Sequence, residues 1–170
     1  WTKFTLDDIE DSMVALPKKR LKEHQKEALN DVLNGFKSND RGRLIMACGT
    51  GKTFTSLKIV ERYIEENNIL GANANILYLV PSIPLLSQTI LEWKSQLSYS
   101  EGCDRFGICS DNTAGKTRRN LNADEITVNM PIPSTTDVTR ISEQLNRLKK
   151  DIHDRGRIHF FFSTYQSIDV

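Results

Sequence analysis

A glycine-rich run ending in lysine and threonine, Gly49–Thr53, is the feature that most constrains how this 170-residue chain can fold. The apolar residues 44–47 precede it, and the segment that follows carries Leu57, Val60 and Ile64 at helical spacing. Glycine adopts backbone conformations that other residues avoid, and these conformations let successive N–H groups point inward. The run therefore predicts a sharp turn that leads from a strand into a helix.

Such a turn is typical of a phosphate-binding loop, G-x-x-x-x-G-K-[ST], although Met46 stands in place of the first glycine. Lys52 is expected to reach the β- and γ-phosphates of ATP, and the hydroxyl of Thr53 to bind the Mg²⁺ that ATP brings. Cys48 is interpreted as a small filler, because no histidine is placed to activate it. The alternative is a tight turn with a solvent-exposed lysine. The candidate nucleotide-binding residues of this loop are Ala47, Cys48, Gly49, Thr50, Gly51, Lys52 and Thr53.

Strand and helix patterns alternate along the rest of the chain. The apolar runs predict strands at 76–80, 105–109 and 158–162, whereas three- and four-residue spacing predicts helices at 23–36, 85–93 and 138–152. Thr136 or Asp137 is expected to cap the last helix, and residues 110–136 to form mostly loop. This alternation predicts an α/β domain with a mainly parallel sheet flanked by helices.

Composition excludes few functions. The net charge of +1 gives no general signal for nucleic acid, and no apolar run reaches the length of about 20 residues that spans a membrane. The cysteines, at 48, 103 and 109, have neither a zinc spacing nor an even number, so we expect reduced thiols in a cytoplasmic protein. The beginning of the chain at Trp1 has no signal-peptide pattern, and we expect it to be a piece of something longer.

Two adjacent motifs resemble a known family. The run Ala47–Thr53 is similar to motif I of superfamily-two helicases and translocases, and Leu21–Gln25 resembles the element that precedes motif I in their restriction-enzyme branch. The resemblance implies that Gln25 binds the adenine edge, to which an amide can offer both a donor and an acceptor. Lys22 stands where the family usually has arginine, and we assign it no role. The alternative for Gln25 is a solvated helix residue.

Two later motifs extend the resemblance. Residues 79–89 are similar to motif Ia, and residues 163–167 are similar to a Thr-Tyr-Gln-Ser element that follows a later strand in the same family. These elements hold the sugar-phosphate backbone of DNA in relatives, without reading bases. Leucine and isoleucine at 85, 86, 90 and 91 are expected in the core instead. The candidate nucleic-acid contacts are Ser82, Gln88, Thr164, Tyr165, Gln166 and Ser167.

Together with Cys-Ser-Asp at 109–111 and Pro-Ser-Thr-Thr-Asp at 133–137, the motifs most resemble the ATPase of single-chain type I (type ISP) restriction–modification enzymes and related predicted helicases. The resemblance covers residues 16–168. It implies a first RecA-like domain at residues 21–170, incomplete at its C-terminus, and the amphiphilic residues 1–20, which end in Pro-Lys-Lys-Arg, are interpreted as a lead-in segment before it. It also implies DNA and a second RecA-like domain of the same parent chain as partners.

The carboxylate pair that hydrolysis needs is not recognisable in the sequence. Such a pair follows a buried strand, where one carboxylate holds Mg²⁺ and the other activates water. Asp124-Glu125 has no apolar strand before it. We therefore expect a domain cut before its Walker B strand and inactive by itself. Two other functions stay open: a P-loop enzyme of another kind, such as a small-molecule kinase, and a non-catalytic nucleotide-sensing module.

Overall fold

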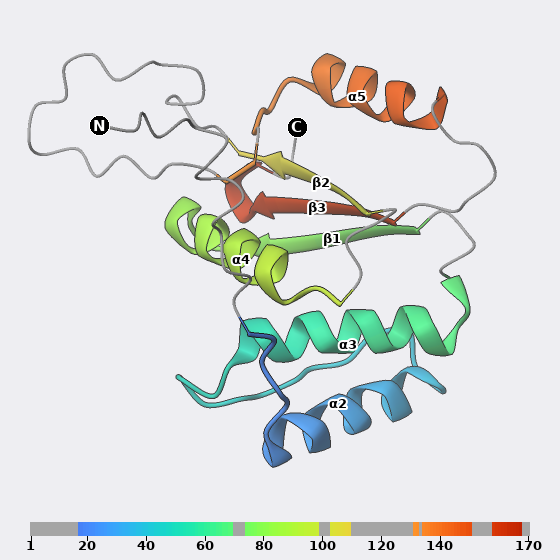
Figure 1. Ribbon diagram of the computed structural model, residues 1–170, viewed down its shortest axis with the longest axis vertical. Coiled ribbons are helices and arrows are strands. Elements are labelled where there is room, and N and C mark those ends of the chain that lie inside the picture. The colour runs from blue at the N-terminus through green and yellow to red at the C-terminus, as the bar shows by residue number, and fades with distance from the viewer. Residues whose placement is uncertain are drawn as a thin grey trace, which may run out of the picture.

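The computed structural model describes residues 17–69, 74–98, 103–109, 131–132, 134–150 and 158–167 (Figure 1). Its regular elements, in chain order, are α2 (Glu23–Phe36), α3 (Lys52–Glu66), β1 (Ala74–Val80), α4 (Ile83–Gln96), β2 (Cys103–Ile108), α5 (Val138–Lys150), β3 (Ile158–Thr164) and the 3₁₀-helix η2 (Tyr165–Ser167).

The three strands form a parallel sheet in the order β1-β3-β2. Val80 at the end of β1 lies beside Thr164 of β3, and Ile108 at the end of β2 lies beside Ser163. All three strands therefore end at the same edge of the sheet. In Figure 1, α5 lies on one side of the sheet and α4, α3 and α2 on the other. The predicted α/β class with a parallel sheet is confirmed.

Local sequence signals explain where two of the helices begin. Asp137 caps α5, because its Oδ1 accepts the backbone N–H groups of Thr139 at 2.9 Å and Arg140 at 3.4 Å. Helix α4 begins at Ile83, two residues earlier than the sequence pattern predicts, and so includes Pro84. Proline is tolerated in the first turn of a helix, where its missing N–H would have no intrahelical partner.

An aromatic cluster forms the centre of the core between the sheet and α4. The ring of Trp93, of which 2% is exposed, meets Tyr78, Phe160 and Phe162 edge-on at centroid distances of 4.9, 5.7 and 5.4 Å. Edge-to-face pairs of this kind add about 0.5–1.5 kcal/mol each beyond the area that they bury. The rings therefore hold α4 in a defined position against β1 and β3.

Four residues of α4 were expected in the core, and one of them is not there. Leu86 and Ile90 are fully buried and Leu85 packs against the same cluster, whereas Leu91 is 53% exposed. Residue 91 follows a buried position by one, which turns it about 100° around the helix. The prediction for Leu91 is wrong for this geometric reason.

The strand expected before the glycine-rich turn is also missing. Residues 41–47 have no regular secondary structure, and Ile45 is 84% exposed. An apolar run forms a strand only where another strand supplies hydrogen-bond partners, and no described strand lies beside this segment.

Several other predictions concern parts of the chain outside the described residues. They include most of the lead-in segment 1–20, most of the loop 110–136, and Asp124-Glu125. Within the part that the structure describes, no helix is both long and apolar enough to cross a membrane. The cysteines at 48, 103 and 109 form no disulfide bond.

Candidate functional site

The glycine-rich run forms the tight turn that the sequence predicts. Gly49 and Gly51 have φ angles of 75° and 83°, in the left-handed region that favours glycine, and Gly51 is the N-cap of α3. A Cβ atom on Gly51 would lie 2.5 Å from Nε2 of Gln25. Gly51 is therefore required twice, by its backbone conformation and by the close approach of a side chain from α2.

Polar side chains of the loop itself hold its shape. The hydroxyl of Thr50 donates to the carbonyl of Ala47 at 2.7 Å. The ammonium of Lys52 donates to the carbonyls of Met46 at 3.2 Å and Ala47 at 3.0 Å. Lys52 thus folds back over the loop. Its positive charge and the positive N-terminal end of the α3 dipole are therefore both at this loop. This arrangement suits an anion held by the loop, because backbone N–H groups, helix end and ammonium act at one place.

Gln25 connects α2 to this loop. Its side chain is 5% exposed, its Oε1 accepts the backbone N–H of Lys22 at 2.9 Å, and its Nε2 donates to the carbonyl of Thr50 at 2.9 Å. The structure thus brings together Gln25 and the loop, two features 25 residues apart in sequence. The amide has two N–H groups and two lone pairs, and these two bonds use one of each, so one N–H and one lone pair of Gln25 remain without a partner among the described residues.

His24 is a neighbour of the loop that sequence reasoning missed. Its Nε2 lies 3.3 Å from the carbonyl oxygen of Thr50, the same atom that Gln25 contacts. The sequence signal was its place beside Gln25 in the upstream element, but nothing in the pattern said which way the imidazole points.

Trp93 is a second missed neighbour. Its indole N–H donates to the carbonyl of Thr53 at 3.1 Å, and the hydroxyl of Ser56 donates to the same carbonyl at 2.8 Å. The first turn of α3, which carries the predicted Mg²⁺ ligand, is therefore bonded to the buried core of α4. A tryptophan at helical spacing indicates burial, but its N–H partner 40 residues away cannot be found from sequence.

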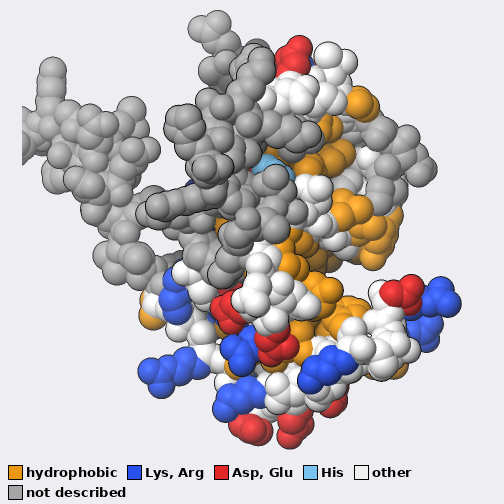
Figure 2. Space-filling view, turned by 90° about the vertical axis from the view of Figure 1, so that its right-hand side faces the viewer, with side chains coloured by type: hydrophobic (Ala, Val, Ile, Leu, Met, Phe, Trp, Pro, Cys, Tyr) orange, Lys and Arg blue, Asp and Glu red, His pale blue; other side chains and the backbone are white. Residues whose placement is uncertain are grey.

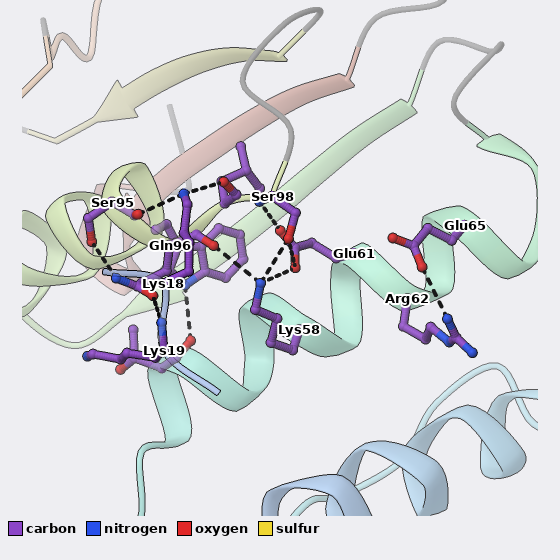
Figure 3. A network of polar contacts seen from close by, with 12 residues as sticks. Lys18, Lys19, Lys58, Glu61, Arg62, Glu65, Ser95, Gln96 and Ser98 are labelled. Carbon is purple, nitrogen blue, oxygen red and sulfur yellow. Dashed lines mark hydrogen bonds and ion pairs between the residues drawn. The ribbon is translucent and has the colours of Figure 1, made fainter. Parts of the chain in front are cut away.

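A buried ion pair joins α3 to the chain just after α4 (Figure 3). Lys58 and Glu61 are 2.6 Å apart, with side chains 17% and 5% exposed. Glu61 also accepts the backbone N–H of Ser98 at 2.5 Å, and Lys58 donates to the carbonyl of Gln96 at 3.2 Å. Both charges are thus paired and hydrogen-bonded, which is the condition for burying them.

The chain before α2 is fastened to the same end of α4. Lys18 donates to the carbonyls of Ser95 at 2.9 Å and Leu97 at 2.8 Å, and the backbone N–H of Lys19 donates to Oε1 of Gln96 at 2.6 Å (Figure 3). A cation at the C-terminal carbonyls of a helix is favourable, because those carbonyls carry the negative end of the helix dipole.

The candidate nucleic-acid contacts divide into two groups. Ser82 and Gln88 of the α4 region are exposed, as are Tyr165 and Gln166. Two others are buried: Thr164 and Ser167 are 3% and 4% exposed, and the hydroxyl of Thr164 donates to that of Ser167 at 3.1 Å. That bond closes η2 against the end of β3. The register of Val80 with Thr164 places both candidate segments at the same edge of the sheet.

No group of three or more histidine, cysteine or carboxylate side chains able to hold a metal ion lies within the described residues. Nor does any carboxylate follow β1, β2 or β3 directly in the described part of the chain. The hydroxyl of Thr53 is the one predicted Mg²⁺ ligand whose position the structure gives.

Comparison with known proteins identifies relatives. The family model for the res subunit of type III restriction enzymes matches residues 18–170. The comparison with curated protein sequences finds no significant match. Among solved structures, a nuclease-deletion mutant of the type ISP restriction–modification enzyme LlaGI, in complex with a DNA substrate mimic, is 36% identical with a TM-score of 0.68. The match covers 88% of this chain and 13% of that chain.

A second solved structure is similar over almost the whole chain. The ATP-dependent type ISP restriction–modification enzyme LlaBIII, bound to DNA, is 33% identical with a TM-score of 0.74. The match covers 99% of this chain and 10% of LlaBIII, so the chain spans a small part of the enzymes that it resembles. These matches confirm the RecA-like fold and the resemblance to type ISP enzymes. Because the family model matches nearly all of the described residues, the chain belongs to the family of the res subunit of type III restriction enzymes.

Proposed function

We propose that this chain is the first, ATP-binding RecA-like domain of a DNA-dependent translocase or helicase in a restriction–modification system. The observation that carries the proposal is the loop at the start of α3. Two glycines with positive φ, a lysine folded over the loop and a helix N-terminus meet there, and Gln25 braces the loop from α2. Such loops bind the phosphates of nucleotides.

Four residues of the loop, and Gln25 beside it, have specific roles in this proposal. Gly49 and Gly51 let the backbone N–H groups face the phosphates, and Lys52 exchanges its bonds to two loop carbonyls for phosphate oxygens. The hydroxyl of Thr53 binds Mg²⁺, whose chemical contribution is to neutralise charge between the β- and γ-phosphates. The uncommitted N–H and lone pair of Gln25 match the donor and acceptor on the adenine edge.

DNA is the proposed macromolecular partner. Ser82, Gln88, Tyr165 and Gln166 would contact the sugar-phosphate backbone, because they are exposed and their segments share one edge of the sheet. Ligands bind at the carboxyl ends of strands in parallel α/β sheets. The related LlaGI and LlaBIII structures contain DNA or a DNA mimic, which supports the proposal. Thr164 and Ser167 would shape this edge from within.

We further propose that the sheet is completed by strands that carry the catalytic carboxylates and that a second RecA-like domain faces the loop. The outer edge of β1 has no partner strand among the described residues. One face of the same strand is also uncovered, since the side chain of Leu77 is 51% exposed. Parallel sheets are normally covered on both faces. The apolar run 44–47, with Ile45 84% exposed, would then become a strand of this enlarged sheet.

A cavity supports the same proposal. It has a volume of about 690 Å³ and lies between the C-terminal parts of α2 and α3 and the beginning of β1. Figure 2, which shows this side of the molecule, has hydrophobic side chains exposed between the layers. Phe36, Tyr63 and Ile69 are among those that line the cavity.

The proposed location of the protein is the cytoplasm, because all three cysteines are thiols.

ATP hydrolysis by the full-length protein, measured with and without duplex DNA, tests the proposed function. We expect turnover that requires Mg²⁺ and rises when DNA is added. Phosphate transfer from ATP to a small metabolite, without any effect of DNA, would instead indicate a kinase. Tight ATP binding without turnover under all conditions would indicate a nucleotide-sensing module.

A further inference from the structure

The last turn of α4 holds the chain that leads into α2. Between residues 17 and 21, the hydrogen bonds to other elements all go to residues 92–97 of α4 and its end, among the described residues (Figure 3). Lys18 contacts two backbone carbonyls there, and the ammonium of Lys19 pairs with Glu92 at 2.8 Å. The residues from 17 to 22 have no helix or strand of their own. Their position therefore depends on α4.

Gln96 is the centre of this attachment. Its side chain is 3% exposed, and its Oε1 accepts the backbone N–H of Lys19 at 2.6 Å. Its own backbone carbonyl accepts the ammonium of Lys58 from α3 at 3.2 Å. It is thus the one residue in this part of the structure that is bonded both to the chain before α2 and to the helix that follows the loop.

A short path leads from Gln96 to the loop. Three residues after Lys19, the backbone N–H of Lys22 donates to Oε1 of Gln25, and Nε2 of Gln25 donates to Thr50. Gln25 is therefore oriented from two sides, by the loop through its nitrogen and by residue 22 through its oxygen. Lys22 is the N-cap of α2 and this second contact is part of its capping box, so it joins the chain that follows Lys19 to the amide of Gln25.

We propose that Gln96 is a positioning residue for recognition of the adenine base, acting through Lys19 and Lys22 on the side-chain amide of Gln25. The proposal deepens the proposed function and rests on it, because it requires Gln25 to face the base. When the acceptor at residue 96 is removed, the N–H of Lys19 loses its partner, and the support that the chain before α2 gives to the amide of Gln25 through Lys22 is weakened, while the bond to Thr50 stays. The phosphate contacts of the loop stay, because they involve other atoms.

The test compares ATP and GTP affinity in full-length protein, using fluorescent analogues of both nucleotides. Gln96→Leu keeps the volume of the side chain and removes the acceptor. We expect it to lower the ratio of ATP to GTP affinity about 3- to 10-fold, the range for loss of one hydrogen bond. Gln96→Glu keeps an acceptor oxygen among Lys18, Lys19 and Lys58, and we expect it to retain the ratio. Lys94→Ala, an exposed change on the same turn, is the matched control.

Gln25→Ala, measured in parallel, separates the two levels of the proposal. If it abolishes the preference for ATP while Gln96→Leu leaves the preference intact, the role of Gln96 is wrong and base recognition by Gln25 stands. If the unchanged protein shows no preference for ATP, both are wrong. Equal losses of ATP and GTP affinity in Gln96→Leu would mean that Gln96 only supports the fold, which overturns the proposal.

Discussion

Lys52 has protein partners at the position where phosphates are expected. Its ammonium is bonded to the carbonyls of Met46 and Ala47, so nucleotide binding exchanges these neutral acceptors for charged ones. Hydrogen bonds to charged groups contribute about 1.5–3 kcal/mol each, against about 1 kcal/mol for neutral ones. The difference favours binding, and it depends on this one side chain.

Lys52→Ala is accordingly predicted to abolish measurable ATP binding and to leave the fold intact. The loss of two charged contacts corresponds to about 3 kcal/mol or more, which is roughly a 100-fold weaker affinity. Titration with a fluorescent ATP analogue measures it, with circular dichroism as the check on folding. Lys26→Ala, an exposed lysine on α2, is the control. Unchanged affinity in the Lys52 variant would rule out the phosphate-loop role.

Two glycines in the same chain should respond to alanine in opposite directions. Gly51→Ala places a Cβ atom 2.5 Å from Gln25 at a φ of 83°, and the left-handed conformation alone costs about 1–2 kcal/mol. Gly35→Ala, inside α2 with no atom within 4 Å of the new Cβ, should stabilise by about 0.5–1 kcal/mol. Urea unfolding of both variants measures the difference. A stabilised Gly51→Ala protein would contradict the described loop conformation.

At the scale of elements, α3 carries ion pairs of different burial, and Figure 3 shows two of them. Glu61 is 5% exposed beside Lys58, whereas Glu65 is 44% exposed beside Arg62. Removal of one partner from a buried pair leaves an uncompensated charge, which costs about 3–5 kcal/mol. Exposed pairs contribute less than about 1 kcal/mol.

The same substitution at both positions tests this contrast. We predict that Glu61→Ala lowers the free energy of unfolding by about 3 kcal/mol or more, and Glu65→Ala by less than about 1 kcal/mol. Glu61→Ala also frees the N–H of Ser98 and loosens the junction of α3 with the end of α4. Chemical denaturation of the two variants decides it, and equal effects would show that the buried network does not stabilise this junction.

The elements differ in how well the sequence predicted them. Helix α2 has the expected bounds of 23–36, because its apolar stripe and its stop signals are local. The sheet class also followed from local patterns. The apolar run 44–47 was predicted wrongly as a strand, because strand formation depends on a neighbour that local sequence does not reveal.

The candidate site was predictable to a similar extent. The glycines and Lys52 carry a motif whose spacing is fixed by phosphate geometry, so the loop could be found from sequence. The bonds from Trp93 to Thr53 and from Gln96 to Lys19 join residues 40 and 77 positions apart. Such contacts depend on how α4 packs. For the same reason, the burial of Thr164 and Ser167 could not be distinguished from the exposure of Tyr165.

At the scale of the whole molecule, the described residues hold the loop proposed to bind phosphate but do not include the carboxylates that hydrolysis needs. Thr53 supplies one predicted Mg²⁺ ligand, and within the part of the chain that the structure describes no carboxylate directly follows the end of a strand. The bare edge of β1 and the exposed segment 41–47 are where further strands would join. Binding and turnover should therefore separate when the chain is tested at different lengths.

We predict that the 170-residue chain binds ATP weakly and hydrolyses essentially none, with or without DNA. The described residues place no carboxylate directly after a strand to activate the attacking water, and none of their arginines is expected to neutralise charge on the γ-phosphate, an effect of about 10³–10⁵ in rate in related NTPases. A chain extended through the next strands should gain Mg²⁺-dependent ATP binding, and one that includes the second domain should gain DNA-stimulated turnover. Phosphate release from the three forms measures this, with Lys52→Ala in the longest form as the control. If the 170-residue chain hydrolyses ATP as fast as the longest form, the catalytic carboxylates lie within these residues and the proposed division of the site is wrong.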